Sequence, residues 1–145
     1  MLPDLEDGLL PAGIYEATWD VIVGAFGFND RRRWLLEGLY LALVALRDAG
    51  CERVYLDGSF VTDKETPGDF DLCWDIPNPV DQSKFDPVLL DFDFPRAAQH
   101  IKFRGDILPN VTEGNSGTPF VEFFQIDKIT GGAKGIISID LRGLT

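Results

Sequence analysis

The segment from Asp69 to Trp74, DFDLCW, constrains the fold more than any other part of the sequence. Successive side chains of a β-strand point to opposite faces of a sheet, so a strand here places Asp69 and Asp71 side by side on one face and the intervening apolar residues on the other. The apolar face needs a core. The acidic face needs a proton or a bridging divalent cation, because two carboxylates this close repel each other. The segment therefore predicts a sheet with one buried face and an opposite face suited to Mg²⁺ or Mn²⁺.

Two amphipathic helices are predicted before this strand. Thr18 caps a short helix that ends near Gly27. Asn29 or Asp30 caps a longer helix that runs to about Ala49, in which apolar residues recur at three- and four-residue spacing. Helices followed by strands in this way are typical of an α/β (α+β) domain.

Three consecutive arginines, Arg31, Arg32 and Arg33, occupy the first turn of the longer helix. The helix dipole disfavours cations at this end, so one interpretation is that these charges have a specific role. We favour the simpler interpretation of a solvated helix face, because that is the usual fate of a run of charges.

The rest of the chain is expected to complete a small mixed sheet of about four strands, with helices packed on one face. The predicted elements are a strand at residues 53–57, surface loops at 76–95 and 109–119, a short helix at 96–103, and a β-hairpin whose strands are 120–126 and 135–141. Residues 1–13 form an extended arm, and residues 1–145 form a single domain.

The composition fits one globular domain and excludes several classes of protein. Hydrophobic residues make up 45% of the 145 residues, which is enough for a core. No apolar run approaches the roughly 20 residues that cross a bilayer, and the N-terminus is acidic, so we expect a soluble cytoplasmic protein without a membrane partner. Cys51 and Cys73 lack metal-ligand spacing and are expected to be reduced. The net charge of −11 argues against a broad nucleic-acid-binding surface, because Lys and Arg build such surfaces.

A third carboxylate is expected from the predicted hairpin. In the segment GIISIDLR, Asp140 alternates onto the polar face. Glu122 is the alternative, but it alternates with apolar side chains, so Asp140 is favoured. Three convergent carboxylates could hold two metal ions for an in-line displacement at phosphorus. Gly58 and Ser59, just after the strand at 53–57, would let a phosphate approach the backbone and would donate hydrogen bonds to it.

The string GSFVTDKETPGDFDLCW, residues 58–74, resembles the nucleotide-binding signature of the DNA polymerase β-like nucleotidyltransferase superfamily, in which a Gly-Ser pair precedes Asp-x-Asp on a strand. The tail ISIDLRG resembles the strand that carries the third carboxylate of that superfamily. The whole chain is also similar to a family of small bacterial proteins of this type. The resemblance implies the minimal nucleotidyltransferase fold, Mg²⁺, and a nucleoside triphosphate such as ATP as donor. It also implies Asp69, Asp71 and Asp140 as catalytic residues and metal ligands.

One departure from this signature concerns the triphosphate. Members of the superfamily often have an Arg shortly after the Gly-Ser pair, whereas residues 61–63 of this chain are Val, Thr and Asp. Arg96, His100 and Arg104 recur every four residues on one helix face and are the expected substitute. Arg142 is a second candidate. A solvated basic helix face explains the same pattern equally well.

The resemblance implies transfer of a nucleoside monophosphate from the triphosphate to a hydroxyl of a partner protein or of RNA such as tRNA. By analogy with small stand-alone proteins of this fold, the chain would act within a toxin-antitoxin or phage-defence pair. The alternative is a catalytically degenerate module of the same fold that binds and regulates a partner protein. The altered phosphate-binding stretch favours this alternative, whereas the retained carboxylates oppose it.

Overall fold

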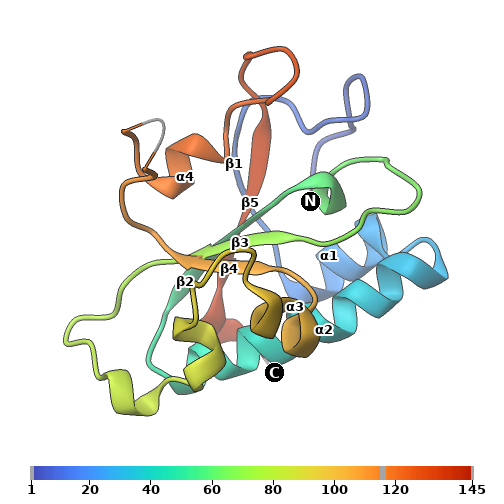
Figure 1. Cartoon of the computed structure of the whole chain (residues 1–145). Helices are drawn as coiled ribbons and strands as arrows, with labels where there is room; N and C mark the ends of the chain where they lie inside the picture. The colour runs from blue at the N-terminus through green and yellow to red at the C-terminus, as the bar shows by residue number, and fades with distance from the viewer. Residues whose placement is uncertain (1, 115–116, 145) are drawn as a thin grey trace.

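A computed structural model of the chain describes residues 2–114 and 117–144 and contains one five-stranded mixed sheet in the order β1-β5-β2-β3-β4 (Figure 1). The strands are β1 (Gly13–Glu16), β2 (Arg53–Asp57), β3 (Asp71–Trp74), β4 (Asp106–Pro109) and β5 (Gly135–Asp140). β2 is antiparallel to both β3 and β5, whereas the pairs β1–β5 and β3–β4 are parallel. The predicted α/β domain with a small mixed sheet is confirmed, and the sheet gains β1 and β4, which the sequence pattern does not predict.

The helices of the described residues are α1 (Trp19–Phe26), α2 (Asp30–Asp48), α3 (Ala97–Phe103) and α4 (Phe120–Phe123). Both predicted caps are confirmed, because the side chain of Thr18 accepts a hydrogen bond from the N–H of Val21, and that of Asn29 from the N–H of Arg32. α1, α2 and α3 gather on one side of the sheet, and the short α4 lies on the other (Figure 1). None of these helices is long and apolar enough to cross a membrane.

The face of the sheet toward α2 carries the main core. The inward residues of β2 and β3 are at most 4% exposed, and they are Val54, Leu56, Leu72 and Trp74. Leucines spaced three and four residues apart on α2 pack into the same core, and they are Leu35, Leu39, Leu43 and Leu46. The alternation predicted for DFDLCW is therefore confirmed, and the residues of opposite parity on β2 and β3 face away from α2.

The predicted β-hairpin is wrong in its first half. Residues 120–123 form α4, because Phe120, Phe123 and Phe124 recur at helical spacing and pack together over Cys73 as a small second core. This helix also corrects the expectation that all helices lie on one face of the sheet. The second half of the hairpin is confirmed as β5, which pairs with β1 and β2.

The arginine triplet is not simply a solvated helix face. Arg32 is 0% exposed, whereas Arg33 is exposed. Arg31 and Arg32 donate hydrogen bonds to backbone carbonyls of the loop between β2 and β3. The solvated interpretation therefore holds for Arg33 alone.

Most of the remaining local predictions agree with the structure, and the extended arm at the start of the chain is the exception. Residues 76–95 are mostly loop, with two 3-10 turns at Gln82–Lys84 and Pro87–Leu90. The arm at the start of the chain turns back on itself through a bridge between Glu6 and Leu9 before β1 begins at Gly13. Both cysteines are buried and are not joined in a disulfide, as expected.

Candidate functional site

Three carboxylates stand in a row where β2 ends and where β3 and β4 begin, on the face of the sheet away from α2. Asp57 of β2 is directly opposite Asp71 of β3, and Asp71 is directly opposite Asp106 of β4. Residues paired in this way project to the same face and have Cβ atoms about 5 Å apart. Asp69 lies just before β3, and its carboxylate is within 4.8 Å of that of Asp106, so it joins the same group. The predicted Asp69–Asp71 pair is thus part of a larger aspartate cluster, Asp57, Asp69, Asp71 and Asp106.

Burial and mutual repulsion disfavour the ionised form of the carboxylates in the aspartate cluster. Burial, followed by the charges of the other three carboxylates, raises the pKa of Asp71 to about 7. Burial raises the pKa of Asp69, and the charge of Asp106 adds to it. Burial also raises the pKa of Asp57, although Lys134 donates a 2.9 Å hydrogen bond to this carboxylate. A divalent cation suits such a cluster because it favours the ionised form of each carboxylate.

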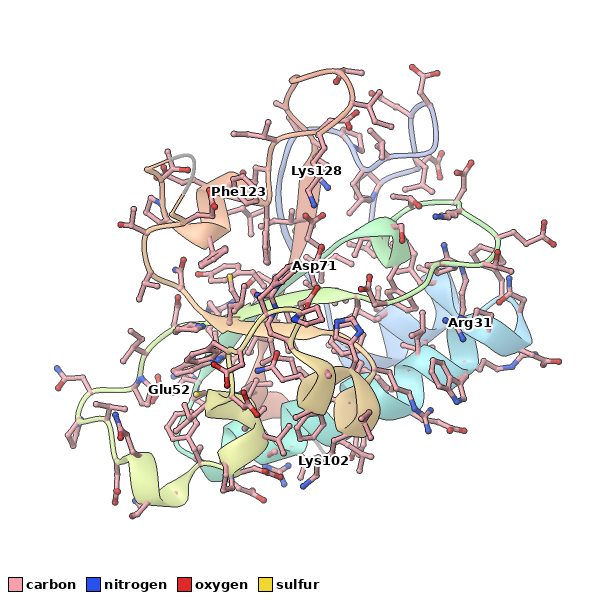
Figure 2. The ribbon with its side chains drawn as sticks, in the orientation of Figure 1. Arg31, Glu52, Asp71, Lys102, Phe123 and Lys128 are labelled. Atoms are coloured by element: carbon pink, nitrogen blue, oxygen red, sulfur yellow. The ribbon has the colours of Figure 1, made fainter. Side chains whose placement is uncertain are left out.

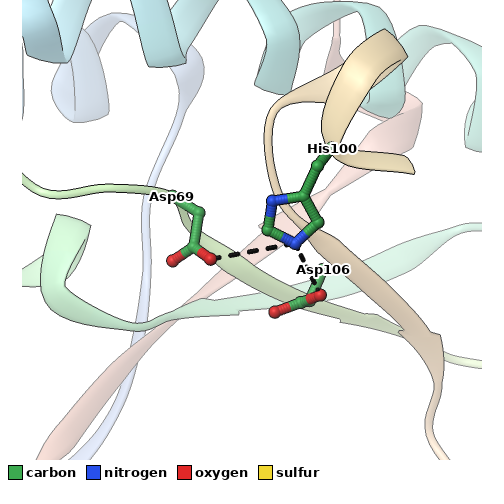
Figure 3. Close-up of side chains that lie close together, drawn as sticks. All are labelled: Asp69, His100 and Asp106. Carbon is green, nitrogen blue, oxygen red and sulfur yellow. Dashed lines mark hydrogen bonds and ion pairs between the residues drawn. The ribbon is translucent and has the colours of Figure 1, made fainter. Parts of the chain in front are cut away.

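His100 lies between two members of the aspartate cluster (Figure 3). Its Nε2 atom is 2.9 Å from Oδ1 of Asp106 and 3.8 Å from Oδ2 of Asp69. Nε of Arg96 donates a 2.8 Å hydrogen bond to the same oxygen of Asp106. Burial by itself raises the pKa of Asp106, but the hydrogen bonds from Arg96 and His100 outweigh burial and hold this pKa below its ordinary value. Ligand atoms of Asp69, His100 and Asp106 all lie within 4.8 Å of one another, so these three residues could hold a metal ion.

A cleft of about 370 Å³ opens beside the aspartate cluster. Its polar lining includes Gly58, Ser59, Asp69, Asp71, Lys128 and Lys134. The lysines come from the connection between α4 and β5, and Lys128 lies across from Asp71 (Figure 2). Gly58 has a φ of 93°, and a Cβ at this position would lie 3.1 Å from both the backbone N and Oδ2 of Asp71. Only glycine lets the chain leave β2 this close to Asp71.

Asp140 lies at the opposite end of the sheet from the aspartate cluster. β5 runs antiparallel to β2, so Asp140 pairs with Arg53 at the start of β2, whereas Asp57 stands at the end of that strand. Arg142 donates hydrogen bonds of 3.0 and 2.9 Å to Asp140, and its side chain is the main cause that lowers the pKa of this carboxyl to about 2. The expected convergence of Asp140 and Arg142 on the site is therefore corrected. Alternation predicts the face of a strand on which a side chain lies, but not which end of the strand meets a distant partner.

The residues predicted to bind phosphate are divided between two places. Arg96 and His100 reach the aspartate cluster, where they act as partners of a carboxylate. Arg104 turns toward α2 and pairs with Glu37 at 3.2 Å. The reason is that α3 ends at Phe103, and Arg104 takes a left-handed backbone conformation with a φ of 72°, which breaks the helical spacing.

Four residues of the site are not predicted from the sequence: Asp57, Asp106, Lys128 and Lys134. Asp106 begins β4, where its N–H donates a 3.0 Å hydrogen bond to the carbonyl of Phe70. The available signal is the short run Gly-Asp-Ile-Leu, too brief to separate from a loop. The two lysines flank a Gly-Gly turn in DKITGGAK. Glu122, the alternative third ligand, is exposed on α4.

Comparison with known proteins assigns the sequence to a family. The family of unknown function DUF6932 matches residues 3–140, a span that includes the entire aspartate cluster and both lysines of the cleft. No significant match was found among curated proteins or solved structures. Because the family match covers nearly the whole chain, the protein belongs to the DUF6932 family.

Proposed function

We propose that this chain is a metal-dependent nucleotidyltransferase whose metal ligands are Asp69, Asp71 and Asp106. One observation carries the proposal: Asp57, Asp71 and Asp106 stand directly opposite one another on adjacent strands, with Asp69 beside them. Like charges gathered on a partly buried face destabilise a fold, and they are tolerated where a cation binds. The resemblance of residues 58–74 to the nucleotide-binding signature of the nucleotidyltransferase superfamily supports a nucleotide as substrate.

The donor set suits Mg²⁺ or Mn²⁺, because carboxylate oxygens are hard ligands. When bound, such an ion neutralises charge on the phosphates and makes an attacking hydroxyl more acidic. The imidazole nitrogen of His100 is a ligand that transition metals accept, and it lies within 4.8 Å of ligand atoms of Asp69 and Asp106. Mn²⁺ is therefore the more informative probe ion.

The cleft supplies groups for a nucleoside triphosphate such as ATP. Lys128 and Lys134 line it together with Asp69 and Asp71. The positive charge of Lys128 offsets part of the rise in the pKa of Asp71. These lysines stand in for the arginine that often follows the Gly-Ser pair in the superfamily. Gly58 allows a phosphate to approach the backbone, and the hydroxyl of Ser59 is a donor at the edge of the cleft.

In the proposed reaction, a hydroxyl oxygen of the acceptor attacks the α-phosphorus of the triphosphate. The bond between the α-phosphorus and the oxygen that bridges to the β-phosphorus breaks, and pyrophosphate leaves. The proton of the hydroxyl passes to Asp71, which lines the cleft and whose pKa is raised to about 7. Arg96 holds Asp106 in place through a hydrogen bond of 2.8 Å.

The proposed acceptor is a hydroxyl of a partner protein or of RNA such as tRNA, within a toxin-antitoxin or phage-defence pair. The net charge of −11 favours a protein acceptor, because an extended nucleic-acid surface would need clustered cations. We also propose a cytoplasmic location, because the nucleoside triphosphates that would serve as donors are found there.

Label transfer from α-labelled triphosphates tests the enzyme proposal. The wild type is incubated with Mn²⁺ or Mg²⁺ and with tRNA or a co-expressed neighbouring protein as acceptor. We expect metal-dependent labelling that Asp71→Asn and Asp106→Asn abolish. Asp140→Asn is the matched control, because it removes a carboxylate of a strand end outside the cleft, and it should label like wild type. Labelling that survives Asp71→Asn, or that depends on Asp140 and not on Asp106, would contradict the assignment.

A second candidate function is a catalytically degenerate module that binds and regulates a partner protein. The observation that favours it is the pairing of Asp106 with Arg96 and His100, since these side chains already satisfy one of the proposed metal ligands. In that case wild type and Asp71→Asn would bind the partner protein equally well, and neither would transfer label.

A further inference from the structure

We propose that Arg31 and Arg32, at the start of α2, are positioning residues of the metal site. They hold the loop of residues 59–68 in the conformation that brings the Gly58–Ser59 turn and Asp69 to one cleft. This inference rests on the proposed function, because it concerns the same metal site. It addresses why two arginines occupy a helix end where the dipole disfavours cations.

The side chain of Arg32 is fully buried, and its guanidinium donates hydrogen bonds to backbone carbonyls. Its guanidinium donates to the carbonyl of Phe60 at 2.7 Å, to that of Thr62 at 2.6 Å, and to that of Lys64 at 2.6 and 3.1 Å. A further bond of 3.2 Å reaches Phe26, just before α2. A planar group with five fixed donors is suited to gathering several carbonyls in this way. The first half of the loop is thereby fixed to α2.

Arg31 holds the second half of the loop, directly before the metal ligand Asp69. Its Nε donates to the carbonyl of Pro67 at 3.0 Å, and its Nη2 donates to that of Gly68 at 2.9 Å. The guanidinium also lies 4.5 Å from the ring centre of Trp34, one turn along α2. Arg31 therefore limits where the backbone can place Asp69.

The carbonyl dipoles explain how these cations are accommodated at the helix end. Asn29, the cap of α2, donates a 2.6 Å hydrogen bond to the carbonyl of Glu65, so the first turn of α2 binds carbonyls along the whole loop. The negative ends of these dipoles offset the cost of placing positive charge beside the N-terminus of a helix. Without these contacts the loop would gain conformational freedom that metal binding would then have to remove.

Arg33 provides the comparison that separates this role from mere charge. Its side chain bonds to Asp30 at 2.5 Å and to the carbonyl of Gly27 at 3.1 Å, and it is exposed. Within the described part of the chain, Arg33 forms no hydrogen bond or ion pair with residues 59–68. Arg33→Ala therefore removes the same charge from the same helical turn and leaves the loop contacts intact.

Calorimetric titration of the whole chain with Mn²⁺ alone tests the inference. We expect Arg31→Ala to weaken Mn²⁺ binding about tenfold, the lower range seen when an outer partner of a metal ligand is lost. Arg31→Lys should restore part of the affinity, because one ammonium can still bond to a carbonyl. Arg33→Ala should bind like wild type. Arg31 is chosen because it is only half-buried, and circular dichroism melts report whether each variant is folded at the titration temperature.

The outcomes separate this inference from the proposed function. If wild type binds no Mn²⁺, the metal site itself fails and the positioning role fails with it. If wild type binds Mn²⁺ and Arg31→Ala binds it equally well, the metal site stands and the positioning role is overturned. If affinity falls only in proportion to the fraction of unfolded protein, Arg31 acts on stability alone and the inference is likewise overturned.

Discussion

Replacing Asp71 by Asn should stabilise the protein in the absence of metal at pH 8. Burial and the neighbouring carboxylates raise the pKa of Asp71 from its ordinary value of 3.8 to about 7. A pKa difference of about 3 corresponds to about 4 kcal/mol, which is the upper limit of what ionised Asp71 costs the folded state. Asn keeps the shape of Asp and cannot ionise. Because its amide gains no assured partner, we expect about half of this limit as a net gain.

The sign of the effect depends on pH. The pKa of Asp71 is higher in the folded state than in the unfolded state, so its contribution to stability is fully present below pH 4. That contribution is lost as the pH rises through about 7. Wild type without metal should therefore lose stability between pH 5 and pH 8 in excess of Asp71→Asn. A gain of about 2 kcal/mol at pH 8 corresponds to a melting temperature higher by about 4–8 °C for a domain of this size.

Urea unfolding in EDTA at pH 5 and pH 8 measures this difference directly. Asp140→Asn is the control of opposite sign, because the hydrogen bond from Arg142 lowers the pKa of Asp140 to about 2. Its carboxylate should favour folding at pH 8, with the benefit lost as the pH falls through about 2. Excess Mn²⁺ should stabilise wild type and leave Asp71→Asn unchanged. If Asp71→Asn is less stable than wild type by the same amount at both pH values, the electrostatic account of the aspartate cluster is refuted.

Two further substitutions probe the rest of the site. Lys128→Ala should weaken binding of the Mn²⁺ complex of a non-hydrolysable ATP analogue about tenfold, because it removes a charge-assisted hydrogen bond. Binding of Mn²⁺ alone should be unchanged. Calorimetry with and without nucleotide measures both affinities, and Lys84→Ala is the control. Arg32→Met should lower the free energy of unfolding by about 3–5 kcal/mol, because it leaves buried carbonyls without donors. Chemical denaturation measures this loss, with Arg33→Met as the control. An equally small loss of stability in both variants would show that the account of Arg32 is mistaken.

Local patterns of the sequence were sufficient for the elements that build the core. The caps Thr18 and Asn29, the leucine spacing of α2 and the alternation of DFDLCW each depend on residues within a few positions of one another. The closeness of Asp69 to Asp71 follows from their separation of two residues at the start of β3. These features are determined by the sequence alone because neighbouring residues share one backbone conformation.

Tertiary structure decided which distant residues join the site. Asp106, not Asp140, stands beside Asp71, because β4 pairs in parallel with β3 and β5 runs antiparallel on the far side of β2. The burial of Arg32 likewise depends on carbonyls about 30 positions away along the chain. Alternation and helical spacing repeat identically at both ends of an element, whereas the partner of each end is chosen by the packing of the whole sheet.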